Sequence, residues 1–138
     1  MIKRYWINFF ILKDKEDFEA AFEILEPLSK KYLQNFEIFF LLGSVLYQSA
    51  NFKKAVEYLQ EAIALKPSHS LSSLCLIQTL GELNKWHTAF EEMRRFLLTD
   101  SKNKEEHILL LRELADEIDN FDTSERATIK KLQNHFHH

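Results

Sequence analysis

A spacing of 34 residues that recurs along the chain is the feature that most constrains its fold. Aromatic residues occur at Phe18, Phe52 and Trp86. An alanine follows three positions after each of them, and a large apolar residue follows seven positions after each. Three columns that keep one spacing through three copies indicate a repeated structural unit, and a period of 34 residues is typical of arrays of helix pairs. The length of 138 residues corresponds to four such units and two further residues.

The composition favours helices and excludes nucleotide-binding loops. The chain has only two glycines, Gly43 and Gly81, and two prolines, Pro27 and Pro67. Loops that hold phosphates or dinucleotides need several glycines within a few residues, and β-sandwiches and barrels need many turns rich in Gly and Pro. We therefore expect an all-α protein in which helix pairs form an array.

The charge balance argues against nucleic acid and membranes as partners. The chain has 18 basic and 21 acidic residues, for a net charge of −3, so it lacks the basic surface that binds phosphates. Its one cysteine, Cys75, cannot form an intrachain disulfide and fits a reducing, cytoplasmic location. No apolar run approaches the roughly 20 residues of a membrane span. Residues 1–12 are basic and then apolar, but charged residues follow, so we expect an amphipathic first helix rather than a signal peptide.

Residues 36–69 form the clearest unit. Its first helix should carry on one side Phe39, Leu42, Gly43 and Leu46, and its second helix, from Phe52 to about Lys66, should turn inward Ala55, Leu59, Ala62 and Ile63. Glycine in a helix interior costs about 1 kcal/mol relative to alanine, so we expect Gly43 where the neighbouring helix approaches closely. Ala50 and Asn51 should form the turn, and Pro67 should close the unit.

This unit resembles the tetratricopeptide repeat (TPR). The residues that match the repeat pattern are Phe39 in place of the usual tryptophan, Leu42, Gly43, Tyr47, Phe52, Ala55, Tyr58, Ala62 and Pro67. Residues 70–103 match less fully, and residues 2–35 match mainly in their second helix, where Pro27 should kink or end the helix. Residues 104–137 read as a degenerate repeat or capping helices, since terminal repeats are commonly atypical. The resemblance implies that residues 1–138 form one domain, a right-handed superhelical array of antiparallel helix pairs, or α-solenoid.

The resemblance implies a non-enzymatic interaction module that binds a partner protein in a concave groove lined by the first helix of each pair. Its register assigns to the groove Trp6, Phe10, Phe40, Leu41, Ser44, Tyr47, Leu71, Leu74 and Gln78. Most are aromatic or apolar, the types that anchor partner peptides. They lack the Lys, Asn and Arg clamp with which related repeats hold acidic chaperone termini. We therefore expect the ligand to be an extended or helical apolar segment.

Two alternatives to a partner in the groove remain open. The same apolar surface would serve a structural subunit that forms a homo-oligomer or part of a larger assembly, and it would also suit internal burial under the C-terminal helix. A weaker and more specific resemblance is to the small tetratricopeptide chaperones that escort hydrophobic translocators of type III secretion systems. The apolar groove, size and acidity of the chain suit that role.

No group of residues predicts catalysis, a cofactor or a metal ion. Ser68 and Ser70 flank His69 after Pro67, and we expect these serines to cap the following helix. The acidic residues from 116 to 125 lack the spacing and the glycine of a calcium-binding loop. We expect His87 and His107 on the surface or partly buried.

Overall fold

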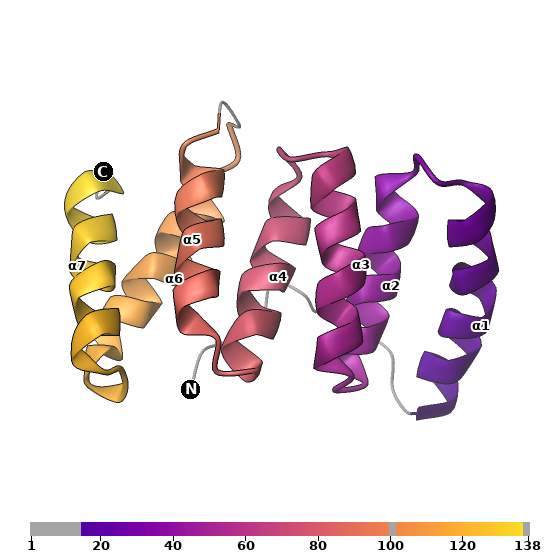
Figure 1. Ribbon diagram of the computed structural model, residues 1–138, viewed down its shortest axis with the longest axis horizontal. Helices are drawn as coiled ribbons and strands as arrows, with labels where there is room; N and C mark the ends of the chain where they lie inside the picture. The colour runs from indigo at the N-terminus through magenta and orange to yellow at the C-terminus, as the bar shows by residue number, and fades with distance from the viewer. Residues whose placement is uncertain (1–14, 100–101, 137–138) are drawn as a thin grey trace.

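The computed structural model describes residues 15–99 and 102–136. Over these residues it contains helices and no strand: α1 (Lys15–Lys31), α2 (Phe36–Gln48), α3 (Phe52–Leu65), α4 (Ser70–Glu82), α5 (Trp86–Leu97), α6 (Glu105–Asp116), the 3₁₀ turn η2 (Ile118–Asn120) and α7 (Thr123–Phe136). Figure 1 shows them side by side in one row, with α1 at one end and α7 at the other. The predicted all-α solenoid is confirmed.

The helices form two layers. Contacts along the chain join α1 to α2, α2 to α3, α3 to α4, α4 to α5 and α6 to α7. Further contacts join α2 to α4 and α4 to α6 in one layer, and α5 to α7 in the other. Figure 1 shows α6 crossing behind α5. The division of the chain into units of 2–35, 70–103 and 104–137 stays a prediction.

Gly43 lies where α2 and α3 approach each other, as predicted. A Cβ atom at this position would lie 2.5 Å from Cγ of Leu59. Leu59 has no exposed surface, and neither has Ala55 one turn earlier on the same face of α3. The glycine therefore lowers the helix propensity of α2 but allows α2 and α3 to pack closely.

Two turns between helices share one geometry. Ala50, after α2, has a φ of 64°, and Asn84, after α4, has a φ of 57°. In the first turn, the backbone N–H of Asn51 donates to the carbonyl of Leu46 at 2.8 Å, the bond that ends many helices with a left-handed residue. The same bond occurs 34 residues later, between Lys85 and Leu80. The expected turn at Ala50 and Asn51 is confirmed.

Of the two outcomes expected at Pro27, a kink or an early end, the early end is wrong, and the predicted capping of α4 by serines is wrong as well. The first helix of the described region does not end early at Pro27 but continues to Lys31. Pro27 is exposed, so water can bond the carbonyl that the proline leaves without its helical partner. The serines do not cap α4. His69 does so, because its Nδ1 accepts the backbone N–H of Ser72 at 3.3 Å.

None of the described helices combines the length and the apolar character that a membrane crossing requires.

Candidate protein-binding groove

Seven of the nine predicted groove residues fall within the described part of the chain. The helix α2 carries Phe40, Leu41, Ser44 and Tyr47, and α4 carries Leu71, Leu74 and Gln78. The two sets lie on helices that contact each other directly. We call them the α2–α4 face. Trp6 and Phe10 lie outside the described residues.

Most side chains of the α2–α4 face are buried. Phe40, Ser44, Tyr47, Leu74 and Gln78 each expose 5% of their surface or less. Leu41 and Leu71 are half-buried. A ligand therefore contacts the five buried side chains only where the packing over them opens.

Aromatic contacts fix the two rings of this face. The Phe40 ring meets the His69 ring edge to face, with centroids 5.0 Å apart. The Tyr47 ring meets the Phe52 ring in the same way at 5.5 Å. Such pairs each contribute about 0.5–1.5 kcal/mol beyond the area that they bury. The rings are therefore held in place before any ligand arrives.

Gln78 brings an amide into the apolar surroundings of this face. Its side chain is 5% exposed, and its Oε1 atom accepts no hydrogen bond from any residue of the described ranges 15–99 and 102–136. Buried polar groups are nearly always paired, and an unpaired one costs about 1–3 kcal/mol. The Gln78 oxygen thus offers an acceptor to a backbone N–H group that enters the face.

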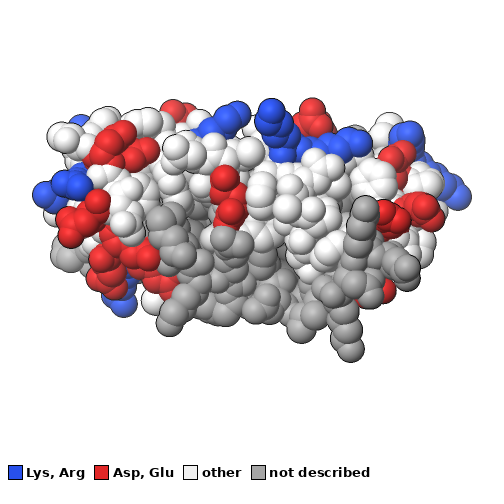
Figure 2. Space-filling view, turned by 90° about the horizontal axis from the view of Figure 1, so that it is seen from below, with Lys and Arg blue, Asp and Glu red and all other residues white. Residues whose placement is uncertain are grey.

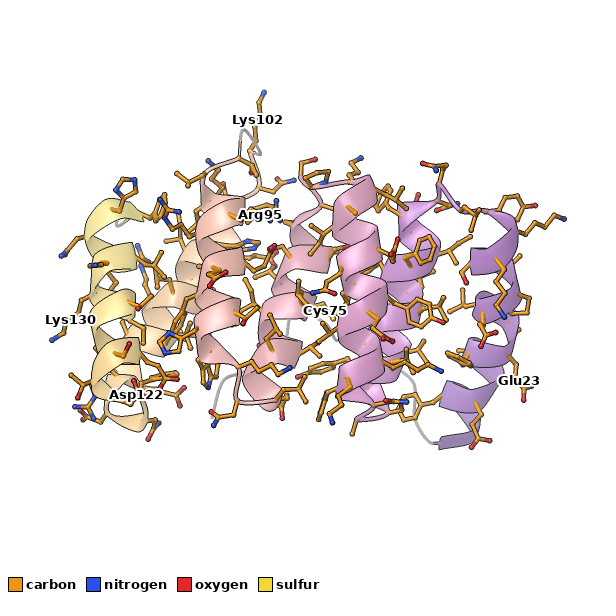
Figure 3. All side chains as sticks on the ribbon, viewed as in Figure 1. Glu23, Cys75, Arg95, Lys102, Asp122 and Lys130 are labelled. Carbon is orange, nitrogen blue, oxygen red and sulfur yellow. The ribbon has the colours of Figure 1, made fainter. Side chains whose placement is uncertain are left out.

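Cys75 lies on α4 in the interior of the array (Figure 3). Burial raises the pKa of its thiol to about 12, and hydrogen-bonding contacts with Ser44 and Thr79 only partly offset this rise. Because the thiolate is the reactive form, the native thiol should be inert.

We expect Cys75 to react with a disulfide reagent such as Ellman's reagent at least about 100-fold more slowly in the native protein than in urea. Burial and the raised pKa both suppress the thiolate. Absorbance at neutral to mildly alkaline pH gives the rate. Equal rates in the two states would show that the packing around Cys75 opens as freely as an unfolded chain.

A buried polar network joins α4, α5 and α6. The Ser73 hydroxyl donates to Glu92 Oε2 at 2.6 Å, and His107 Nε2 lies 2.9 Å from the same hydroxyl oxygen. Arg95 donates to both oxygens of Glu92, from Nε at 2.7 Å and from Nη2 at 2.6 Å. Since the serine proton goes to the carboxylate, Nε2 of His107 carries a proton and donates to Ser73.

This network resembles a catalytic triad in composition but not in its hydrogen bonds, because the Ser73 hydroxyl donates to Glu92 rather than to His107. Ser73 and His107 have no exposed surface. Burial, with a smaller effect of the Arg95 charge, lowers the pKa of His107 to about 3, which makes it a poor base near neutral pH. The network instead links three helices.

The expectation that His107 is surface-exposed or partly buried is wrong, because its ring stacks on Phe96 with centroids 3.9 Å apart.

The 34-residue period contained the signal for this network. Ser73 and His107 occupy the same column as Phe39, and Glu92 occupies the same column as Tyr58. In residues 36–69, Phe39 and Tyr58 stack with centroids 6.4 Å apart. Polar residues in both columns of the next unit therefore indicate a hydrogen-bonded pair in place of the aromatic pair.

One cluster has the composition of a metal site. His87 and the carboxylates of Asp122 and Glu125 each place a ligand atom within 4.8 Å of the others. Asp122 and Glu125, however, already bond each other's backbone N–H groups, at 2.7 and 3.0 Å, as a capping box at the start of α7. The positive end of the helix dipole there disfavours a cation. The cluster is explained by capping, and His87 is exposed as expected.

Comparison with known protein families finds a match for the unit that contains α2 and α3. Residues 36–69 match the sequence profile of the tetratricopeptide repeat family. Together with the row of packed helices, this match fits a tetratricopeptide-like repeat protein. Tetratricopeptide repeats generally mediate protein–protein interactions and are typically non-catalytic. The curated proteins include no significant match to this repeat protein.

Proposed function

We propose that this repeat protein binds an apolar, extended or helical segment of a partner protein on its α2–α4 face. Phe40, Tyr47 and Leu74 supply apolar anchors on two helices that touch. Leu41 and Leu71, which are half-buried, supply the part of the face that a ligand meets first. Large anchors that are already ordered lower the entropy cost of binding.

The buried amide of Gln78 is the observation that carries this proposal. A purely structural face has no need of an amide whose oxygen accepts no hydrogen bond from the described residues. A peptide in the face would donate a backbone N–H group to that oxygen and remove its desolvation cost. Apolar side chains of the same peptide would pack against Tyr47 and Leu74.

The physiological role that we propose is that of an adaptor or a chaperone. A chaperone would protect a hydrophobic segment of a client protein, such as a secreted translocator, from aggregation. The alternative is self-association through the same face. It predicts that a second copy of this chain, rather than a segment of another protein, binds to the α2–α4 face.

Peptides selected from a phage-displayed library on the immobilised protein test the proposal. We expect the selected peptides to be rich in apolar residues at helical or alternating spacing. Replacement Gln78→Leu should weaken their binding about 10-fold, the effect of about 1.4 kcal/mol, as measured by fluorescence anisotropy. The same variant should unfold at equal or higher urea concentration, because leucine fills the site without an unpaired amide.

A matched control is Gln60→Leu, which changes an exposed glutamine on α3. We expect it to leave peptide binding unchanged. Equal binding by the Gln78→Leu and Gln60→Leu variants would contradict the proposal, and so would selection of charged peptides alone. A role of Gln78 in stability alone predicts a changed unfolding midpoint with unchanged affinity.

A further inference from the structure

Exposed apolar side chains gather on the outer side of α1 and in the turn after it. Ile24 is 65% exposed and Leu28 is 36% exposed. Tyr32 and Leu33, just after the helix, are 47% and 64% exposed. Phe22, on the opposite side of α1, packs against the core. The helix thus has one apolar side toward the array and a second apolar stripe toward solvent.

The opposite end of the array is different. The outer residues Lys130, Lys131 and Asn134 of α7 are exposed and polar. Figure 3 shows Lys130 pointing outward at the α7 end and Glu23 pointing outward at the α1 end. Terminal units of a solenoid normally present a polar outer face to water. Within the described residues α7 presents such a polar face, whereas α1 has the exposed apolar stripe that marks an interaction surface.

Most exposed charged side chains of α1 between Asp17 and Lys31 differ in sign between its first half and its last turn. Its first half carries exposed Asp17, Glu19 and Glu23, and its last turn carries exposed Lys30 and Lys31. Figure 2 shows acidic and basic groups exposed together at this end of the molecule. The outer stripe itself reads Asp17, Ala20, Ile24, Leu28 and Lys31, with steps of three and four residues that keep one helix face. It is therefore acidic at one end, apolar in the middle and basic at the other.

We propose that α1 packs antiparallel on α1 of a second copy of this chain. A two-fold axis near Ile24 places the apolar centres of the two stripes together. Asp17 and Lys31 are each seven residues from Ile24, which is about 10 Å along the helix. The two-fold axis therefore brings Asp17 of each copy opposite Lys31 of the other.

A symmetric pair suits these ends better than a head-to-tail chain of copies. Head-to-tail stacking would place Ile24 and Leu28 against Lys130 and Lys131 of α7, and it would desolvate both ammonium groups without a partner. Antiparallel pairing of α1 with itself avoids this cost and closes the assembly at two copies.

The interface is small. One face of a four-turn helix on each side buries less than the about 1,600 Å² of a typical stable interface. We therefore expect a dissociation constant on the order of 10–100 μM.

Analytical ultracentrifugation of the full chain from about 5 to about 500 μM tests the proposal. We expect a monomer–dimer equilibrium in the parent protein. Ile24→Glu should raise the dissociation constant at least about 30-fold, because it places two carboxylates at the centre of the interface. The control Leu109→Glu changes an exposed leucine on α6 and should leave the equilibrium unchanged. Circular dichroism establishes that each variant remains helical.

Charge exchange tests the antiparallel arrangement itself. Asp17→Lys and Lys31→Glu should each weaken the dimer about 3-fold or more, because each places like charges opposite one another. The double variant Asp17→Lys/Lys31→Glu should restore the parent dissociation constant, since opposite charges meet again.

Three results would overturn the proposal. One is a monomer at every concentration. Another is a dimer that Ile24→Glu leaves intact. The third is a double charge variant as weak as the single variants. Because Gln78 lies on the α2–α4 face and not on α1, a dimer lost in Gln78→Leu but kept in Ile24→Glu would instead indicate self-association through the α2–α4 face.

Discussion

The variant Gly43→Ala is expected to destabilise the parent protein but to stabilise a protein in which Leu59 is already replaced by alanine. In the parent protein, Gly43→Ala should lower the free energy of unfolding by about 1–3 kcal/mol, because the new Cβ meets Leu59 Cγ at 2.5 Å and Cδ2 at 2.6 Å. Leu59→Ala alone should lower it by about 2–5 kcal/mol, since Leu59 has no exposed surface. In that background, Gly43→Ala should raise it by about 1 kcal/mol, through helix propensity and filling of the cavity.

Urea unfolding of the four proteins, followed by circular dichroism, measures this coupling as a double-mutant cycle. Gly81→Ala is the matched control. Its Cβ would meet the Trp86 ring at 2.6 Å rather than Leu59, so its effect should be the same with either residue at position 59. An equal loss from Gly43→Ala in both backgrounds would show that Leu59 is not what excludes a side chain at position 43.

Acidification is expected to destabilise the protein through His107 before its carboxylates are fully protonated. In the unfolded chain this histidine takes up a proton near its ordinary pKa of 6.5, whereas in the folded protein its pKa is about 3. Between these values only the unfolded chain binds the proton, so stability that is complete above pH 6.5 is lost as the pH falls toward 3. The loss should reach about 3 kcal/mol at about pH 4.5, at 1.36 kcal/mol per pH unit.

The variant His107→Gln isolates this contribution. Glutamine retains an N–H donor for Ser73 but does not titrate, so the variant should be less stable than the parent near pH 7 and should close most of that gap by about pH 4.5. His69, whose pKa is also lowered by burial, is present in both proteins and cancels in the comparison. Urea unfolding at constant ionic strength gives the two pH profiles. Parallel profiles would contradict the assignment of the pH effect to His107.

The 34-residue period predicted the fold because the contacts that it encodes lie within one helix pair. Phe52, Ala55 and Leu59 recur in register with Trp86, Ala89 and Met93. In the structure these residues lie on α3 and α5, where Ala55, Leu59, Ala89 and Met93 have no exposed surface. When the apolar face of a helix is known and its partner helix follows directly after a short loop, the spacing alone specifies which residues pair.

Exchanges of size and polarity between units were harder to predict. Tyr47 meets Phe52 in one unit, and in the next the same columns hold Gly81 and the larger Trp86. The sequence offered no role for Gly81 until the structure placed the indole ring of Trp86 against it. A small residue at one position makes room for a large one at the other, so the change cannot be recognised from either position of the repeat alone.

The repeat register assigned Phe40, Tyr47, Leu74 and Gln78 to one surface but did not indicate how deeply they are buried. These residues lie on α2 and α4, two helices that contact each other. Whether such residues are open or covered depends on everything that packs near them, which periodicity does not encode. Their role in binding stays a prediction that the Gln78→Leu variant tests.

The sequence by itself determined that the chain forms helices in pairs, where the clearest repeat begins and ends, and which residues of α2 and α3 face each other. These are consequences of local spacing. Only the tertiary structure decided that Ser73, Glu92 and His107 meet in one buried network, and that the apolar outer stripe of α1 and the polar outer face of α7 meet solvent. Both depend on which surfaces remain after all the helices have packed, and that is a property of the whole array rather than of any repeat.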